Sequence, residues 1–489
     1  MYNFLGKDLN KMDNKEFVKD LTKMEDDFAK WYTDIVLKAE LVDYAPIKGF
    51  MVIRPYGYSI WENIQDVLDK KFKELGHKNA YFPLLIPESM LNKEKEHVEG
   101  FAPEVAWVTQ GGENELQERL CIRPTSETII CTMYSKWVRS YRDLPLKYNQ
   151  WANVVRWEKT TRPFLRTAEF LWKEGHTIHA TEQEAIEETL TMHKVYADFC
   201  KDYLAIPVIM GQKSEKEKFA GAQATYTIEA MMHDGKALQS GTSHYFGNHF
   251  AKAFDIKFQN KEGKLEYCYQ TSWGMTTRII GGIIMVHGDD RGLKLPPKIA
   301  PIQVVIVPIA QQKENVLEVT KNLQEKLSDK YSVELDERSE VSPGFKFNYW
   351  ELRGVPVRIE IGPKDIANNQ CVVFRRDTLE KEIVSLDDLE EKIEFLMEDI
   401  QNNMYEKAKE NFEKRTFIAH DFEEYKKIFK ENEGFAKIMW CGDRECEDKI
   451  KEENSTTIRC IPFEEDKFQD VCSICGKKAK HMVYTARQY

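Results

Sequence analysis

Apolar residues recur at every third or fourth position between residues 14 and 37, which is the spacing of one face of an amphipathic helix. The side chains concerned are Phe17, Leu21, Met24, Phe28, Trp31 and Ile35. A second pattern of this kind predicts a helix over residues 58–75, and the continuous apolar run that follows at 81–86 predicts a strand. We also expect a helix over residues 182–203.

Segments rich in β-branched and aromatic residues alternate with these helices along the chain. They lie at residues 120–123, 151–157, 224–229, 237–239 and 265–271. Such segments form strands, and their alternation with helices predicts a mixed sheet covered by helices. The expected fold class is therefore α/β.

Residues 295–301, Leu-Pro-Pro-Lys-Ile-Ala-Pro, are too rich in proline for a helix and predict a linker. Beyond it, expected strands at 303–307, 333–335, 357–361 and 371–374 alternate with expected helices at 313–328 and 345–352. This alternation is typical of βαβ units and predicts a small, mostly parallel sheet. Ser385, with Asp388 three residues later, is expected to cap a helix whose apolar face runs from Leu386 to Met404.

A chain of 489 residues is long enough for about three domains. Its composition, 42% hydrophobic and 31% charged, is that of a soluble globular protein. The polar start has no signal-peptide core, and no run approaches the ~20 apolar residues of a membrane span, so we expect a cytoplasmic protein. A net charge of −11 disfavours a protein that coats RNA, but it permits local basic patches that read RNA.

Ten cysteines fall into two groups. Cys121, Cys131, Cys200, Cys268 and Cys371 are scattered singly, as buried reduced thiols of a cytosolic protein would be. The others crowd the end, where Cys441-x4-Cys446 and Cys472-x2-Cys475 form two knuckles and Cys460 stands apart. Four thiolates from two short turns can complete a tetrahedral zinc shell, so we predict zinc, with free thiols or disulfides as the alternative.

Two arginines, Arg156 and Arg278, stand in the runs Val-Arg-Trp-Glu and Gly-Met-Thr-Thr-Arg. Arginine keeps its charge and binds phosphate through two parallel hydrogen bonds, so such residues suit a site that holds a nucleoside triphosphate. The run Arg123-Pro-Thr-Ser-Glu127 adds a hydroxyl and a carboxylate, Thr125 and Glu127, which suit a cationic amine.

The ordered motifs RPTSE, VVRWE, FLRTAEFLW, QSGTSH and SWGMTTR resemble those of the prolyl-tRNA synthetases, a class II aminoacyl-tRNA synthetase family. Gly76 and Pro83 resemble motif 1, Arg156 and Glu158 motif 2, and Arg278 motif 3. Only about 100 residues separate Trp172 from Ser272. The chain therefore resembles the archaeal and eukaryotic type, which lacks the large editing insertion.

The resemblance implies ATP-dependent ligation of L-proline to tRNA(Pro) through a prolyl-adenylate, with release of AMP and pyrophosphate and with Mg²⁺ accompanying ATP. It implies a homodimer and three parts: an α+β catalytic domain with a mixed, mainly antiparallel sheet at residues 1–295, an α/β anticodon-binding domain at 296–402, and a small C-terminal domain with structural Zn²⁺ at 403–489. In the family the chain ends with a tyrosine that lies near the active site, and the last residue here is also a tyrosine, Tyr489.

The same resemblance assigns roles residue by residue. Arg156 and Arg278 would be the catalytic residues, Arg156 joining the α-phosphate to the proline carboxylate and Arg278 holding the γ-phosphate with Arg166. Further ATP contacts would come from Glu158, Thr167, Gln239, Thr242 and Thr276. Proline would be bound by Arg156, by Thr125 and Glu127 at its ammonium, and by Phe170, Trp172, Phe219 and His244 around its ring.

In the middle domain Lys346, Glu351, Glu360, Lys364 and Asp365 resemble the family's anticodon-reading face, with solvated loop charges as the alternative. Two other functions remain open at this point. One is another ligase of the same subclass, such as a threonyl enzyme, which would use different zinc ligands. The other is an inactive paralogue that only binds RNA, although such paralogues commonly lose the motif 2 or motif 3 arginine, and both stand here.

Overall fold

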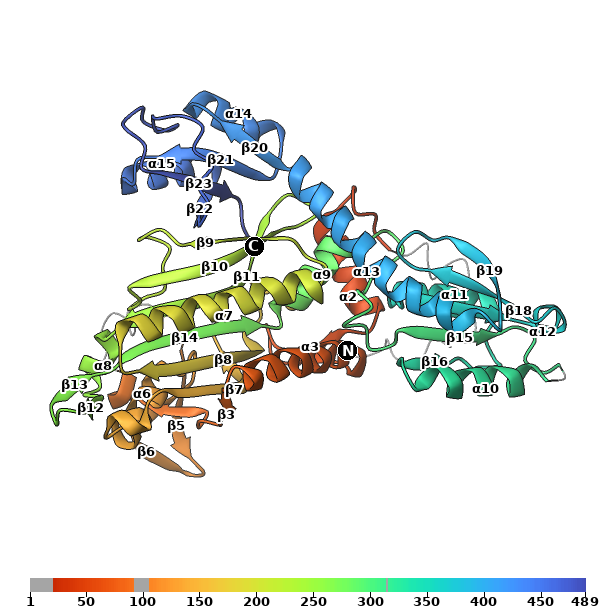
Figure 1. Ribbon diagram of the computed structural model, residues 1–489, viewed down its shortest axis with the longest axis horizontal. Coiled ribbons are helices and arrows are strands. Elements are labelled where there is room, and N and C mark those ends of the chain that lie inside the picture. The colour runs from red at the N-terminus through yellow and green to blue at the C-terminus, as the bar shows by residue number, and fades with distance from the viewer. Residues whose placement is uncertain (1–20, 92–104, 314) are drawn as a thin grey trace.

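A computed structural model describes residues 21–91, 105–313 and 315–489. The chain forms a large sheet with helices at one side, followed by a second α/β part that begins after residue 300 (Figure 1). A C-terminal part, which begins with β20 (Thr416–Ala419), adds its strands to the large sheet. The long helix α13 (Leu389–Lys414) runs between the last two parts. None of the helices in these ranges is long and apolar enough to cross a membrane, and a cytoplasmic location stays a prediction.

The first described helix is α2 (Phe28–Lys38), which begins after Asp27 because the Asp27 side chain accepts a hydrogen bond from the backbone N–H of Lys30. The helix predicted from residue 14 was therefore too long at its start. Leu21 to Asp27 lie in turns and bends, and the predicted positions before Leu21 lie outside the described residues. Trp31 and Ile35 are buried as the pattern predicted.

Helix α3 (Pro55–Glu74) confirms the helix expected over 58–75, with Pro55 in its first turn, where no backbone N–H is needed. The strand expected over 81–86 is reduced to β4 (Leu85–Pro87), and Tyr81 is 73% exposed. The remaining small elements of this part are β1 (Val42–Tyr44), β2 (Met51–Ile53), β3 (Lys78–Asn79), α4 (Glu88–Leu91), β5 (Ala106–Gly111), β6 (Asn114–Ile122), α6 (Glu127–Trp137), the 3-10 turn η3 (Tyr141–Asp143), α8 (His249–Ala253), β12 (Lys257–Gln259) and β13 (Leu265–Tyr267).

The large sheet has eleven strands in the order β20-β21-β23-β22-β9-β10-β11-β14-β8-β7-β3. Residues 21–91 and 105–295 are here called the catalytic part, after the domain expected from the sequence. They contribute β7 (Leu146–Val155), β8 (Glu169–His179), β9 (Val208–Gln212), β10 (Ala224–Met231), β11 (Ala237–Gly247) and β14 (Tyr269–Thr276) to this sheet, all paired antiparallel, with β3 parallel to β7. The α/β fold class with a mixed, mainly antiparallel sheet is confirmed.

Two helices cover one face of this sheet (Figure 1). Helix α7 (Glu182–Asp202) begins with a reciprocal cap in which Thr181 and Glu184 satisfy each other's backbone N–H groups. Helix α9 (Arg278–His287) carries only apolar residues and glycine between its two end residues, and all of these are buried. Between β8 and β14, Gly175 lies opposite Trp273, and a Cβ on Gly175 would come within 2.1 Å of the indole ring. Only glycine fits this position.

The second part holds a five-stranded sheet in the order β16-β15-β17-β18-β19. Its strands are β15 (Val304–Pro308), β16 (Val333–Leu335), β17 (Val357–Ile361), β18 (Gln370–Arg375) and β19 (Lys381–Ser385), with helices α10 (Val316–Ser328), α11 (Pro343–Leu352) and α12 (Pro363–Ala367). The prediction of a mostly parallel sheet was wrong. Two strand pairs are parallel and two antiparallel, because β17, β18 and β19 follow one another through short connections.

Helix α13 begins at Leu389 and continues to Lys414, ten residues beyond the last apolar position of its predicted pattern. The predicted domain boundary at residue 402 therefore falls inside a helix, and the division into domains stays a proposal. The C-terminal part contains β20 (Thr416–Ala419), α14 (Phe422–Glu431), β21 (Phe435–Trp440), α15 (Arg444–Asn454), β22 (Thr457–Pro462) and β23 (His481–Ala486).

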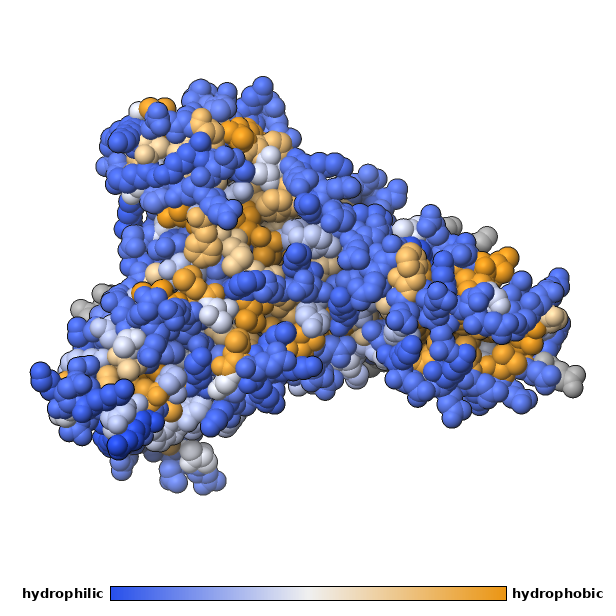
Figure 2. Space-filling view, viewed as in Figure 1, coloured by the Kyte–Doolittle hydropathy of each residue, from blue (hydrophilic) through white to orange (hydrophobic). Residues whose placement is uncertain are grey.

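The visible surface is mainly hydrophilic, with apolar groups scattered over each part (Figure 2). Several large apolar side chains in the first hundred residues of the catalytic part are strongly exposed. They include Tyr44, Ile47, Val52 and Tyr81, each more than half exposed. Tyr44 and Val52 lie on the paired strands β1 and β2, and Ile47 lies between these strands, so three of the four share one hairpin. Clustered exposed apolar side chains are typical of interaction surfaces.

Candidate active site

A cavity of about 220 Å³ opens over the middle of the large sheet. Its walls come from the β7–β8 connection, the residues after β9, strand β11 and the end of β14. Twelve residues predicted from the sequence line it: Arg156, Glu158, Arg166, Thr167, Phe170, Trp172, Phe219, Gln239, Thr242, His244, Thr276 and Arg278. The structure therefore brings together residues that are up to 122 positions apart.

Arg156 directly follows β7 and is held on both sides. Its backbone N–H donates to the carbonyl of Ala168 at 2.8 Å, and its Nε donates to the carbonyl of Pro124 at 3.1 Å. The guanidinium carbon lies 5.4 Å from the centre of the Phe170 ring and 5.8 Å from that of Trp172. These contacts fix the plane of the guanidinium before a ligand arrives, which is the condition for strong electrostatic binding.

Arg278 is the first residue of α9, where its Nε donates to the carbonyl of Leu165 at 3.0 Å. Burial, together with the nearby cations Arg156 and Arg166, lowers the pKa of Arg278 to about 10, against the opposing effect of Glu158. The guanidinium stays charged at neutral pH. Since three guanidinium groups repel one another in one cavity, an anionic ligand would relieve that repulsion.

Thr125 and Glu127 do not line the cavity but stand beside it, at the start of α6. Both are buried, and the Thr125 hydroxyl donates to the Glu127 carboxylate. Pro124, which lies between β6 and this helix, accepts the hydrogen bond from Arg156. The Arg156 guanidinium therefore contacts the segment that carries Glu127 three residues later, and a ligand with both an ammonium and a carboxylate requires charges of both signs in this region.

Aromatic rings surround the same end of the cavity. The rings of Phe170 and Trp172 meet edge to face at 6.2 Å, and Phe219 lies 4.5 Å from His244. His244 Nδ1 and the hydroxyl of Thr225 form a hydrogen bond of 3.0 Å. Burial lowers the pKa of His244 to about 3, so the imidazole is neutral at pH 7. The surroundings suit a small apolar ring.

Sequence reasoning missed two groups of residues at this site. The first is Glu174 with His176 on β8, which lie so close to Glu127 that their ligand atoms fall within 4.8 Å of one another. Glu174 accepts hydrogen bonds from Gln150 at 2.6 Å and from Ser126, and it is 2.9 Å from His176 Nε2. The sequence did contain a signal for Glu174 and His176. They stand at every second position of β8 after Phe170 and Trp172, so all four side chains lie on the same face of the strand.

The second missed group is Lys213, Glu217 and Ser240, which line the cavity. Lys213 follows β9 directly, and its ammonium is 2.8 Å from a carboxylate oxygen of the buried Glu229. No motif marks this residue in the sequence. Its position depends on the pairing of β9 with β10, which sequence reasoning did not predict.

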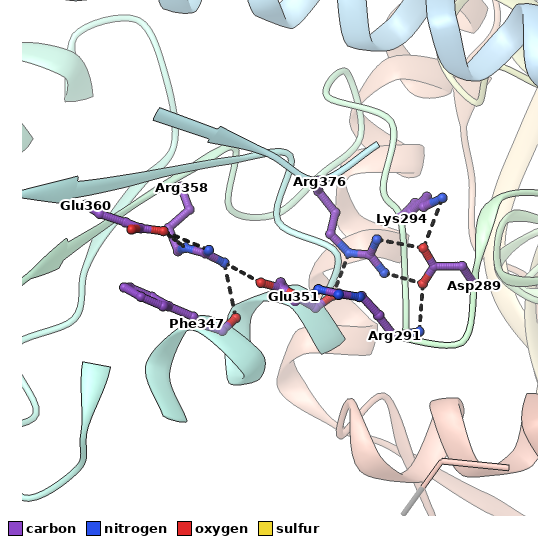
Figure 3. Close-up of polar contacts among 8 residues, drawn as sticks. All are labelled: Asp289, Arg291, Lys294, Phe347, Glu351, Arg358, Glu360 and Arg376. Atoms are coloured by element: carbon purple, nitrogen blue, oxygen red, sulfur yellow. Dashed lines mark hydrogen bonds and ion pairs between the residues drawn. The ribbon is translucent and has the colours of Figure 1, made fainter. Parts of the chain in front are cut away.

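Two of the five residues predicted to read an anticodon, Glu351 and Glu360, lie inside the second part (Figure 3). Glu351 accepts from Arg358 at 2.9 Å and from Arg291 at 3.0 Å, and Glu360 accepts from Arg358 at 2.8 Å. Lys381 also donates to Glu360, at 2.8 Å. Both carboxylates are buried. They are therefore engaged within the protein, next to the contact between Arg376 and Asp289 that joins the second part to the catalytic part.

The other three predicted anticodon residues differ in exposure. Lys346 is buried, and its ammonium donates to the carbonyl of Asp336 at 2.7 Å. Asp365 accepts from the backbone N–H of Gly362 at 2.9 Å, so it caps α12. Lys364 on the same short helix is exposed.

The four terminal cysteines converge. Their Sγ atoms are separated by 3.6 Å between Cys441 and Cys446, 3.7 Å between Cys441 and Cys475, and 4.0 Å between Cys446 and Cys472. A tetrahedral zinc ion with Zn–S bonds near 2.3 Å requires sulfur separations of about 3.8 Å. The side chains fit such an ion. Cys460 is buried elsewhere, against β9.

The last residue, Tyr489, packs on the catalytic part. Its backbone N–H donates to the carbonyl of Ala237 at 3.1 Å and its hydroxyl donates to Asp234 at 2.5 Å. The Arg162 guanidinium lies 5.8 Å from its ring. Arg162 belongs to the connection between β7 and β8, so the end of the chain supports a segment of the cavity wall.

Comparison with known families agrees with this arrangement. Residues 107–287 match the tRNA synthetase class II core domain (G, H, P, S and T), residues 303–396 match the anticodon binding domain, and residues 422–489 match the prolyl-tRNA synthetase C-terminal domain. The sheet, its cavity and the first of these matches define a class II aminoacyl-tRNA synthetase.

Relatives specify the family further. A proline–tRNA ligase of Alkaliphilus oremlandii is 64% identical over 97% of this chain and 99% of its own length. Proline–tRNA ligase 2 of Clostridioides difficile is 62% identical with the same coverage, and a proline–tRNA ligase 2 of Bacillus cereus is 61% identical over 97% of this chain and 100% of its own length. The chain belongs to the prolyl-tRNA synthetase family.

Proposed function

We propose that this chain ligates L-proline to tRNA(Pro) at the expense of ATP, through a prolyl-adenylate intermediate. The observation that carries the proposal is the convergence of Arg156, Arg166 and Arg278 in one cavity, with Glu127 three residues after the carbonyl of Pro124 that holds Arg156. Fixed cations suit a nucleotide's phosphates, and a carboxylate beside one of them suits the ammonium of an amino acid. The relatives named above are proline–tRNA ligases over nearly the full chain.

In the first step a carboxylate oxygen of proline attacks the α-phosphorus of ATP, and pyrophosphate leaves. Neither this step nor the next needs a protein nucleophile, so positioning and charge neutralisation lower the barrier. Arg156 would hold the α-phosphate against the proline carboxylate, and Arg278 with Arg166 would hold the γ-phosphate. Mg²⁺ bound to ATP would supply further positive charge to the phosphates.

The remaining predicted residues orient the substrates. Glu158 and Thr167 would contact adenine, Gln239 and Thr242 the sugar, and Thr276 the nucleotide from the sheet. Glu127 and Thr125 would accept from the ammonium, and the ring would lie among Phe170, Trp172, Phe219 and His244. In the second step a terminal ribose hydroxyl of tRNA(Pro) attacks the prolyl carbonyl, and AMP leaves.

A pyrophosphate-exchange assay across the amino acids tests this function. We expect proline to support exchange far better than threonine, alanine or cysteine. A hydrophobic pocket discriminates against a missing methylene by only about 10 to 200-fold, so weak activation of alanine or cysteine is compatible with the proposal. Exchange that depends on threonine would identify another ligase of the subclass, and a lack of exchange with every amino acid would identify an inactive paralogue.

We further propose a structural Zn²⁺ bound by Cys441, Cys446, Cys472 and Cys475. The sulfur separations of 3.6 to 4.0 Å support it. Four sulfur ligands would close the coordination shell, so the ion would stabilise the fold and take no part in the reaction.

The exposed apolar side chains Tyr44, Ile47, Val52 and Tyr81 support a homodimer, because burial against a second copy would remove them from water. Sedimentation of the purified protein at micromolar concentration should report twice the mass of the chain.

The middle domain, residues 296–402 in our division, would bind the anticodon, with the exposed Lys364 as its phosphate contact. We propose the cytoplasm as the place of the reaction.

A further inference from the structure

The C-terminal part does not merely pack against the catalytic sheet but continues it. Strand β22 pairs antiparallel with β9, with Ile461 opposite Gln212 and Pro462 opposite Gly211. A Cβ on Gly211 would lie 2.4 Å from the carbonyl oxygen of Ile461, so this close approach requires glycine. The pairing brings a residue of β22, Arg459, to the rear of the cavity wall.

Arg459 binds the carboxylate of Glu229 on β10 through two nitrogens of its guanidinium. Its Nε donates to Oε2 at 3.0 Å, and its Nη2 donates to Oε2 at 2.9 Å and to Oε1 at 3.1 Å. Arg459 is 1% exposed and Glu229 is fully buried. A bidentate pair of this kind fixes the orientation of both groups.

The same carboxylate holds Lys213 of the cavity wall. Oε1 of Glu229 accepts from the Lys213 ammonium at 2.8 Å and from the Thr227 hydroxyl at 2.8 Å. Glu229 also stands opposite Gln239 in the pairing of β10 with β11, and both Lys213 and Gln239 line the cavity. A continuous set of contacts therefore leads from the C-terminal part to the proposed nucleotide site.

The charges in this set do not cancel. Two cations, Lys213 and Arg459, share one carboxylate, so two positive charges and one negative charge give a net charge of +1 for three buried side chains. Burial lowers the pKa of Lys213, Glu229 opposes this effect, and Arg459 adds to it. Buried charge is unfavourable unless it is compensated. The cavity also carries the carboxylates of Glu158 and Glu217, and an anionic ligand there would add to their compensation of this charge.

We propose that Arg459 of the C-terminal part is a positioning residue for proline activation: it fixes Glu229, and Glu229 holds Lys213 where its charge stabilises the anionic phosphates as the adenylate forms. This inference rests on the proposed function. It assigns Lys213 an electrostatic role in the active site, and it gives the C-terminal part a role in the reaction besides its own folding.

The test is proline-dependent pyrophosphate exchange by the full-length protein with Arg459→Gln, Lys213→Gln, both changes together, and Arg459→Lys. Loss of a preorganised charge should lower kcat about 10-fold or more in either single variant, with a smaller change in the KM values for ATP and proline. The double variant should be no slower than Lys213→Gln alone, because Arg459 acts through Lys213. Arg459→Lys should recover part of the rate.

Asp448→Asn is the matched control, because Asp448 on α15 forms an ion pair of 2.6 Å with Lys216 between the same two parts of the chain. It should leave kcat unchanged. Zinc content and the melting temperature are measured for each variant, and rates are expressed per active site by burst titration. A wild-type kcat in Lys213→Gln, or effects of the two single changes that multiply in the double variant, would overturn the inference. Failure of the proposed function would appear differently, as no proline-dependent exchange in the unmodified protein.

Discussion

At the scale of single residues, the phosphate-binding arginines and the proposed ammonium partner, Glu127, occupy different places in the site. Arg156 and Arg278 each donate from Nε to a backbone carbonyl, that of Pro124 and that of Leu165, and these contacts fix the orientation of both guanidinium groups. Glu127 stands outside the cavity wall, at the start of α6. This separation allows one end of the site to attract phosphates while the other attracts an ammonium.

Glu127→Gln tests that division. The change keeps the size of the side chain and one acceptor but removes the negative charge, and a charged hydrogen bond contributes about 1.5 to 3 kcal/mol. The KM for proline in pyrophosphate exchange at saturating ATP should rise about 10-fold or more. ATP affinity should change little, because Arg156, Arg166 and Arg278 remain.

Glu262→Gln is a suitable control for this prediction, because Glu262 lies in an exposed turn outside the cavity. Its proline KM should equal that of the unmodified protein. An unchanged proline KM in Glu127→Gln, or a loss confined to ATP affinity, would remove Glu127 as the partner of the ammonium.

At the scale of elements, the zinc knuckles are two short turns held together by a small sheet. Cys441 and Cys446 flank the turn between β21 and α15, and Cys472 and Cys475 lie in the turn before β23. Cys441→Ser should therefore release zinc and destabilise this part, because the binding free energy of structural zinc is part of the folding free energy.

Elemental analysis and thermal unfolding measure both effects. Cys460→Ser is the control, since Cys460 is buried outside the cluster and its replacement should leave the zinc content near one ion per chain. Purified unmodified protein without zinc, or full zinc in Cys441→Ser, would contradict the assignment.

The elements also show how far the sequence predicts this structure. Helix α3 and strands β7, β10 and β17 follow the local pattern of apolar residues, and the motif residues meet because their strands are neighbours in one sheet. Strand β19 carries Glu382 and Ile383 on an exposed edge, so its residues lack a clear apolar alternation and were missed. Lys213 and Arg459 were missed because their roles depend on the pairings of β9 with β10 and β22, which no local pattern encodes.

At the scale of the whole molecule, ion pairs join the catalytic part to both other parts, one of them fully buried and the other partly exposed at Asp289. Arg459 with Glu229 joins the C-terminal part, and Arg376 with Asp289 joins the second part (Figure 3). The exposed Lys364 lies in the second part, on α12, so it should affect tRNA binding without affecting adenylate formation.

Lys364→Ala should accordingly raise the KM for tRNA in the charging reaction several-fold and leave pyrophosphate exchange unchanged, because loss of one phosphate contact weakens RNA binding. Lys409→Ala, an exposed change on α13, serves as the control and should alter neither activity. Equal loss of charging and exchange in Lys364→Ala would contradict an anticodon-side role. Replacement of Lys346 and Glu351 is a poorer test, since both are buried and their loss also destabilises the part.

Buried histidines make the stability of the whole chain depend on pH. Burial lowers the pKa of His179 and His193 to about 4 and that of His244 and His287 to about 3. In the unfolded chain a histidine titrates near a pKa of about 6.5. Between these values the unfolded chain binds protons that the folded chain does not, so the stabilisation is complete above about pH 6.5 and is lost as the pH falls toward about 4.

Potentiometric titration of native and denatured protein measures this difference directly. Near pH 5 these four side chains should account for close to four of the protons taken up on unfolding. As the pH falls from about 7 to about 5, each of them should lower the free energy of unfolding by roughly 2 kcal/mol. His193→Gln should remove about one proton from the uptake, because glutamine can keep the hydrogen bond of 2.8 Å to the carbonyl of Thr227 without titrating. Gln183→Asn, an exposed change on α7 that replaces one non-titrating amide by another, should remove none. An equal uptake in His193→Gln and the unmodified protein would show that His193 is protonated in the folded state.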